Sequence, residues 1–174
     1  HRWLWFDLLK WAFDSASRGA AARVGGCKLI AGNEPSLQGV RAHIKRLAPA
    51  AREEVLAKLL TDLGVKPPPT PTEAYRAVNP SELREMLDSD RVELVGHTVT
   101  HTVATALPPD ALHAELKTCR DELESFCRRP VTTFCYPNGL AGDFDDRTRQ
   151  SLTRAGFTTA RTFTVRPGGA KRRV

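Results

Sequence analysis

Several features are scarce or missing in this sequence of 174 residues. No apolar run approaches the roughly 18 residues that a membrane-spanning helix needs, which excludes such a helix within this sequence. No internal repeat is visible, so a repeat architecture is not indicated. The sequence has no signal-peptide pattern and no initial methionine, and its first residues already resemble the middle of a domain. We therefore expect a fragment of a longer protein.

Cysteine is present but not in a metal-binding pattern. The four cysteines are Cys27, Cys119, Cys127 and Cys135, and none forms a C-x-x-C pair, which argues against a structural zinc knuckle. Cys119 and Cys127 stand eight positions apart in a predicted helix. We interpret them as small core residues rather than as a disulfide, which leaves the redox compartment open.

The composition is that of a globular protein, with 41% hydrophobic and 26% charged residues and a mean hydropathy of −0.35. The length predicts a single domain over residues 1–174 with a core of its own. The net charge is +6 and the pI about 9.5, but the basic residues are spread along the chain. The densest run is Lys171, Arg172 and Arg173 at the end of the sequence. We expect no nucleic-acid partner, although a basic domain is compatible with an anionic surface such as a cell envelope.

Hydrophobic periodicity predicts a mostly helical first part. The expected segments are a helix over residues 2–17, a strand over 27–31, a loop over 32–39 and helices over 38–47 and 51–63. A proline-rich connector follows at residues 67–71. We interpret residues 38–66 as a helical insertion within the single domain.

Helices and strands alternate in the second part, beginning with a helix that Asn79 caps. The expected segments are a helix to about residue 87, a strand over 92–95, a helix from Pro109, a strand over 131–136, a helix over 143–155 and a strand over 157–165. In the helix after Pro109, Glu115 lies off the apolar stripe and is expected to be solvated. This alternation predicts an α/β fold with parallel strands.

Two histidines follow the strand expected at residues 92–95. His97 comes directly after Gly96, and His101 comes four residues later. Neutral imidazole is a common zinc ligand. A helical H-E-x-x-H protease site needs a glutamate after the first histidine, and Thr98 occupies that position. The pair therefore indicates a different kind of metal site, at the end of a strand.

A sharp turn follows the next predicted strand, in the segment Tyr136, Pro137, Asn138 and Gly139. Taken alone, this segment is an ordinary tight turn. Ligands of α/β proteins bind at the carboxyl ends of the strands, so we expect this turn and the two histidines to open on the same face.

Together, the Gly-His-Thr-x-x-His and Phe-x-Tyr-Pro-Asn-Gly patterns resemble the polysaccharide deacetylases of carbohydrate esterase family four, the NodB-type domain. The resemblance is strong over residues 79–163 and weaker at Trp5, Phe6 and Asp7. It implies a distorted (β/α) barrel, which here lacks its first strand or strands. The helical insertion fits one branch of this family.

The resemblance also implies a function, which is metal-dependent hydrolysis of N-acetyl groups from a carbohydrate polymer or oligosaccharide. His97 and His101 would bind one divalent ion, usually zinc, together with an aspartate. The backbone N–H of Asn138 would stabilise the oxyanion, and Tyr136 and Pro137 would lie at the substrate. The class of substrate favours the cell envelope or another extracytoplasmic location, and it leaves the particular glycan open.

The sequence departs from the family pattern in several places. It lacks the Thr-Phe-Asp-Asp-Gly motif that supplies the third ligand and the general base, and it has no Leu-x-His motif for the general acid. Cys135 replaces an arginine. Asp145 and Asp146 stand at a predicted helix start, where acidic residues suit the helix dipole, so we interpret them as structural. We expect weak zinc binding and no turnover from this chain alone, and aggregation through an exposed sheet edge.

Two other functions are compatible with the sequence. One is a glycan-binding module with a degenerate deacetylase fold and no chemistry. The other is a basic protein associated with the envelope or with nucleic acid through charge alone. The second predicts binding that depends steeply on salt and is indifferent to substitution of His97 or His101.

Overall fold

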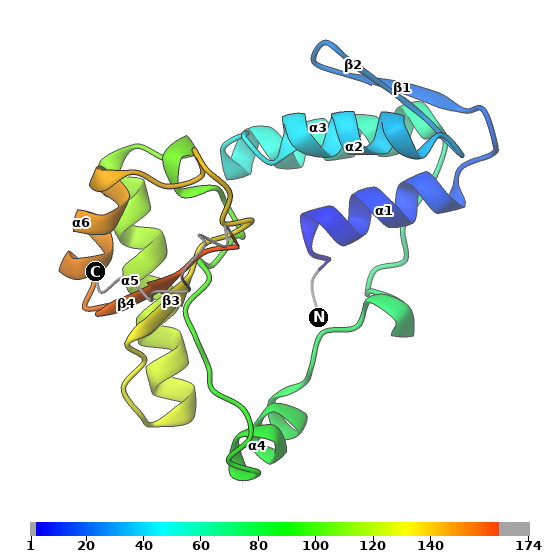
Figure 1. Cartoon of the computed structure of the whole chain (residues 1–174). Coiled ribbons are helices and arrows are strands. Elements are labelled where there is room, and N and C mark those ends of the chain that lie inside the picture. The colour runs from blue at the N-terminus through cyan, green and yellow to red at the C-terminus, as the bar shows by residue number, and fades with distance from the viewer. Residues whose placement is uncertain (1–2, 164–174) are drawn as a thin grey trace. The chain divides into compact units, whose positions relative to one another are not determined.

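The computed structural model describes residues 3–163. The chain divides into two compact units, one ending at Val78 and one beginning at Asn79 (Figure 1). The predicted basic cluster at Lys171, Arg172 and Arg173, and the last two residues of the strand expected at 157–165, lie outside the described residues. Among the residues that are described, no helix is long and apolar enough to cross a membrane.

The first unit packs three helices around an antiparallel hairpin. Its elements are α1 (Trp5–Ser15), β1 (Ala21–Val24), β2 (Cys27–Ile30), α2 (Glu34–Ile44), α3 (Pro49–Leu63) and the short 3-10 helix η1 (Glu73–Tyr75). Val24 pairs with Cys27, so Gly25 and Gly26 form the turn, and Gly25 adopts φ 55°. β1 was not predicted, because a four-residue strand of Ala, Ala, Arg and Val has little apolar character.

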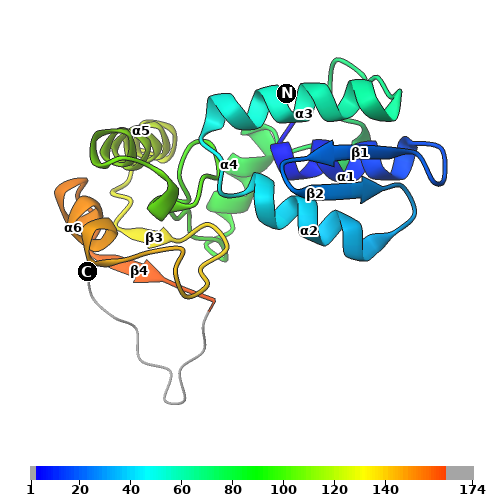
Figure 2. The ribbon, with the colours of Figure 1, turned by 90° about the horizontal axis from the view of Figure 1, so that it is seen from above.

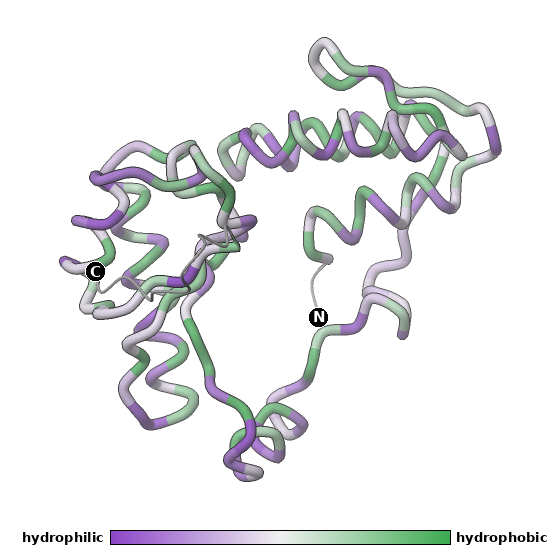
Figure 3. Tube along the Cα trace, viewed as in Figure 1, coloured by the Kyte–Doolittle hydropathy of each residue, from purple (hydrophilic) through white to green (hydrophobic). Residues whose placement is uncertain are grey.

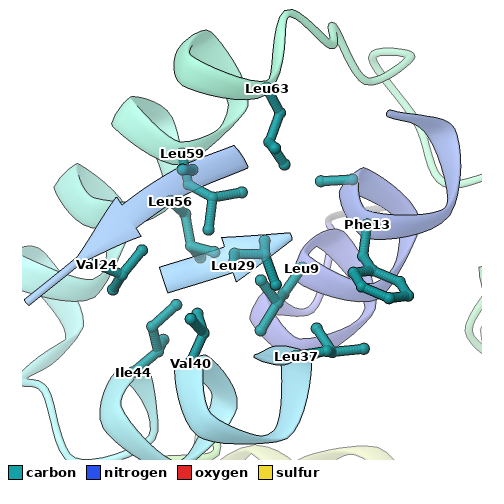
Figure 4. Packing of buried hydrophobic residues seen from close by; sticks show 12 residues of the cluster. Leu9, Phe13, Val24, Leu29, Leu37, Val40, Ile44, Leu56, Leu59 and Leu63 are labelled. Atoms are coloured by element: carbon teal, nitrogen blue, oxygen red, sulfur yellow. The ribbon is translucent and has the colours of Figure 1, made fainter. Parts of the chain in front are cut away.

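The core of the first unit is almost entirely aliphatic. Along the helices of the first unit, hydrophobic and hydrophilic stretches alternate (Figure 3), as expected for helices with one buried face. Side chains from all three helices, among them Leu9, Leu37, Val40 and Leu59, converge on Leu29 of the hairpin (Figure 4). Each buried aliphatic side chain of this size contributes about 1.5–3 kcal/mol.

One helix boundary in the first unit was predicted wrongly. Residues 32–39 were expected to form a loop, but α2 already begins at Glu34. Asn33 caps the helix by accepting a 3.0 Å hydrogen bond from the Ser36 N–H, and Pro35 lies in the first turn, where its missing N–H costs nothing. The second predicted helix is confirmed as α3. Its description as part of an insertion stays a prediction.

The second unit contains parallel strands, as predicted. Its elements are α4 (Pro80–Asp88), the 3-10 helix η2 (Ala104–Ala106), α5 (Pro109–Cys127), β3 (Thr133–Cys135), α6 (Asp146–Arg154) and β4 (Thr159–Arg161). β3 and β4 pair in parallel, with Phe134 opposite Ala160, and Gly96 forms a parallel bridge to Phe134 on the other side of β3. Figure 2 shows β3 and β4 side by side, and α5 packs against α6.

The strand expected at residues 92–95 is not formed. Only the next residue, Gly96, bridges to β3, and Glu93 is exposed while its neighbours are half-buried. A strand in a parallel sheet needs both faces covered, and residues 92–95 do not have that cover. The described residues thus form a mixed helix and strand structure, while the distorted barrel stays a prediction.

Aromatic rings fill the core of the second unit where Gly96 passes. Phe134 and Phe157 are fully buried with Leu112, Leu116 and Leu152. A Cβ atom added to Gly96 would lie 2.7 Å from Phe157 and 2.9 Å from Phe134, closer than carbon atoms pack. Only glycine lets the backbone approach the two rings here, so the residue before His97 is fixed by packing.

Candidate functional site

Two loops leave the same edge of the parallel sheet. The Gly96 N–H donates a 2.9 Å hydrogen bond to the Thr133 carbonyl, and the Cys135 N–H donates a 2.8 Å bond back to the Gly96 carbonyl. Parallel pairing places the carboxyl ends of both segments together. The loop that begins at His97 and the loop that begins at Tyr136 therefore open on one edge, as predicted.

The His97 ring is oriented by the neighbouring strand. Its Nδ1 atom lies 2.8 Å from the Cys135 carbonyl oxygen. A carbonyl oxygen only accepts hydrogen bonds, so Nδ1 must carry the proton, and neutral His97 keeps its lone pair on Nε2. Histidines that bind metals are commonly held in this way, with one nitrogen on a carbonyl and the other on the ion.

The two histidines meet through an irregular loop rather than along a helix. Their ring centroids lie 4.8 Å apart with planes at 74°. Thr98 and His101 adopt φ 65° and 55°, in the left-handed region that non-glycine residues rarely enter. This backbone folds the four-residue spacing back on itself and brings the two imidazoles together.

A glutamate on α5 holds the middle of this loop. The Glu115 carboxylate accepts hydrogen bonds from the Val99 N–H at 2.7 Å, the Thr100 N–H at 3.1 Å and the Thr100 hydroxyl at 2.7 Å. The prediction that Glu115 is solvated was wrong. Glu115 lies off the apolar stripe of α5, but the histidine loop packs over it and donates hydrogen bonds to its carboxylate. No sequence signal marks a contact across fifteen residues.

The second loop turns tightly at Asn138 and Gly139, which have φ 62° and 59°. The Gly139 N–H donates to the Pro137 carbonyl at 2.8 Å, closing a three-residue turn. Within residues 3–163, no backbone acceptor pairs with the Asn138 N–H, and the buried Asn138 Nδ2 also has no partner among these residues. The Asn138 main chain therefore carries an N–H that no described backbone acceptor uses.

The Tyr136 side chain points into the core. It is 2% exposed, and its ring stacks on Phe144 with centroids 4.4 Å apart. Burial raises the pKa of Tyr136 to about 12, and the hydroxyl finds no hydrogen-bond partner within the described part of the chain. The ring thus anchors the loop, and any contact of Tyr136 with a substrate would use its main chain.

The histidine pair fits two positions of a metal site. A catalytic zinc site usually has three protein ligands, and no cluster of three histidine, cysteine or acidic residues that could hold a metal occurs within residues 3–163. Burial raises the pKa of the nearby Cys119 and Cys135 thiols.

The acidic pair at Asp145 and Asp146 has a structural role, as predicted. Asp145 caps α6 by accepting a 2.8 Å hydrogen bond from the Thr148 N–H. Hydrogen bonds from Thr148 also lower the pKa of Asp145. This carboxylate is committed to the helix end.

Comparisons with known proteins found one family and one similar solved structure. A family model described as polysaccharide deacetylase matches residues 49–160. Among solved structures, the chain is similar to the Streptococcus pyogenes deacetylase PplD in complex with acetate, at 21% identity and a TM-score of 0.43. The match covers 60% of this chain and 47% of that one, so this chain spans about half of the solved protein. No curated protein matches the chain.

Proposed function

Because this chain belongs to the polysaccharide deacetylase family, we propose that its domain removes N-acetyl groups from a carbohydrate polymer or oligosaccharide. We propose that a divalent metal ion assists this hydrolysis, with zinc as the first candidate. One observation carries the proposal. The hydrogen bond between His97 Nδ1 and the Cys135 carbonyl leaves a lone pair on Nε2, and the His101 ring centroid lies 4.8 Å from that of His97.

His97 and His101 are the proposed metal ligands in this chain. When bound, the ion would polarise the acetamide carbonyl and make bound water a stronger nucleophile at neutral pH. The Cys135 carbonyl keeps His97 in the required tautomer. The buried Gly96, packed under Phe134 and Phe157, fixes the point from which the loop departs.

The second loop is proposed to bind the reacting acetamide. The Asn138 N–H would donate a hydrogen bond to the oxygen on which negative charge develops. Pro137 restricts the backbone immediately before that donor, and Tyr136 anchors the loop through its buried ring. A donor held in place before the reaction costs no reorganisation during it.

The third ligand and the general base are proposed to come from a part of the protein outside this chain. The family motif that supplies them, Thr-Phe-Asp-Asp-Gly, does not occur in this sequence. We therefore expect the chain alone to bind zinc weakly and to release no acetate.

A glycan-binding module without chemistry is the second candidate. It is favoured by the lack of a three-ligand group within residues 3–163. In that case the longer protein would bind N-acetylated oligosaccharides without hydrolysing them, and zinc would not alter the affinity.

Acetate release distinguishes the two candidates. The full-length protein is incubated with zinc and with chitin oligomers or peptidoglycan fragments, and acetate is quantified. The proposal predicts release that His97→Ala and His101→Ala abolish, while His113→Gln on α5 retains it. Glycan binding without acetate release would support the second candidate and reject the first.

A further inference from the structure

We propose that Glu115 is a positioning residue that holds the loop between His97 and His101, so that the two imidazoles lie next to each other with their ring centroids 4.8 Å apart. The effect of Glu115 on zinc affinity rests on the proposed function, whereas its effect on the conformation of the loop does not. Glu115 itself stays outside the pair of rings and acts through the backbone between them.

The contacts show how one carboxylate can hold this loop. Oε2 accepts two consecutive backbone N–H groups, those of Val99 and Thr100, at 2.7 and 3.1 Å, and Oε1 accepts the Thr100 hydroxyl at 2.7 Å. The Thr100 hydroxyl also lies 2.6 Å from that of Thr102. A carboxylate is an acceptor on both oxygens, so all three donors can be satisfied together.

The loop needs such an external restraint. Thr98 and His101, on either side of the held residues, both have left-handed backbones, which cost free energy and persist only where surrounding contacts impose them. Threonine is β-branched and especially ill-suited to positive φ. The hydrogen bonds to Glu115 lie between these two strained positions and hold the residues that connect the histidines.

The helix that carries Glu115 is itself rigidly seated. Leu112 and Leu116, the residues three before and one after Glu115, are both fully buried in the core of the second unit. Cys119 on the same helix accepts the His97 N–H at 3.4 Å. α5 therefore contacts the loop both at its start and at its middle.

Glu115→Gln tests the proposal with Glu122→Gln as the matched control. Both variants remove one negative charge from α5, but Glu122 is an exposed residue of that helix. In Glu115→Gln, the side chain loses its negative charge and one of its two acceptor oxygens, so the hydrogen bonds from the Val99 and Thr100 N–H groups lose their charge assistance. Amide exchange, the nuclear Overhauser contact between the two imidazoles, and zinc affinity are measured in the full chain.

The proposal predicts faster exchange at Val99 and Thr100 by about tenfold, as expected when hydrogen bonds to a charged group are lost. It also predicts a weaker contact between the rings and a zinc Kd raised about 10- to 100-fold, the range typical of outer-shell substitutions. Glu122→Gln should change none of these quantities.

Two results would reject the proposal. One is a Glu115→Gln variant that matches Glu122→Gln in all three measurements. The other is faster amide exchange with an unchanged contact between the rings, because the carboxylate would then hold the loop without placing the imidazoles. If the unchanged chain does not bind zinc, the weak binding expected of this chain is refuted, and the ring contact alone decides the role of Glu115.

Discussion

The two units differ in which residues occupy left-handed backbone positions. In the first unit, every described residue with positive φ is a glycine, namely Gly19, Gly25, Gly32 and Gly64. In the second unit, five non-glycine residues within the described range also have positive φ: Asp90, Thr98, His101, Arg128 and Asn138. In the first unit, positive φ thus occurs only at the residue type that favours it, whereas in the second unit it also occurs at residue types that adopt it less readily.

Three of the five exceptions lie in the two loops of the candidate site. Strained backbone persists only where surrounding contacts impose it, and it concentrates at functional sites. Glu115 supplies such contacts for the histidine loop, and the short turn at Pro137 and Gly139 fixes Asn138. In the first unit, local backbone preference and packing agree, whereas the loops of the second unit depart from local preference where they carry His101 and Asn138.

The largest expected loss of stability is in the first unit, for Leu29→Ala. Leu29 is fully buried at the centre of the hairpin core, and a buried leucine cut to alanine costs about 2–5 kcal/mol. Urea unfolding measures this loss. Zinc affinity, measured under conditions in which the variant is folded, should be unchanged. A folded Leu29→Ala protein that loses zinc binding would contradict the assignment of the metal-binding histidines to the second unit alone.

Gly96→Ala should be less destabilising but should affect the site. The added methyl would overlap the rings of Phe157 and Phe134, and overpacking of this kind costs about 1–3 kcal/mol. The shift occurs next to His97, so we expect zinc affinity to fall as well. Gly26→Ala is the control, because nothing lies within 4 Å of a Cβ added there; equal effects of the two would contradict the role of Gly96.

Two substitutions at left-handed positions should differ in their effect on the free energy of unfolding. Gly25→Ala should cost about 1–2 kcal/mol, since alanine disfavours positive φ and its Cβ would lie 2.5 Å from the His43 ring. Thr98→Gly should change stability by less than about 1 kcal/mol, because relief of strain offsets the greater freedom of the unfolded chain. Thermal unfolding measures both, and a large loss in Thr98→Gly would show that Thr98 is not strained.

The smallest effect is expected for Tyr136→Phe. The buried hydroxyl has no hydrogen-bond partner among the described residues, so its removal should be neutral or slightly stabilising at pH 7. Burial raises the pKa of Tyr136 to about 12, against about 10 in an unfolded chain.

The pH dependence of this variant follows from the same shift. The unfolded state loses the Tyr136 proton before the folded state does, so Tyr136 lowers stability as pH rises from about 10 to 12. Tyr136→Phe should remove that part of the decline in urea unfolding measured above pH 9. An identical decline in the variant would mean that the hydroxyl ionises freely in the folded protein.

The sequence predicted the parts of the site that follow from strand order. His97, His101 and Asn138 were placed on one edge because parallel strands share their carboxyl ends, and the structure brings both loops there. The helix start at Asn79 was also predictable, and the structure shows its side chain capping α4 together with Glu82.

Features set by tertiary contact could not be predicted. Glu115 binds a loop fifteen residues away, which no local period records. Residues 92–95 have the composition of a strand, but only Gly96 beyond them pairs with β3. The left-handed backbones of Thr98 and His101 oppose local preference, so propensity predicts the wrong conformation at the positions that matter most for the site.

Zinc titration of the full chain tests the central claim, that His97 and His101 form one metal-binding pair. Calorimetry should detect weak binding at a single site in the unchanged chain. His97→Ala and His101→Ala should each remove that binding, and His113→Gln should keep it. Equal zinc affinity in the unchanged chain and both alanine variants would contradict the claim.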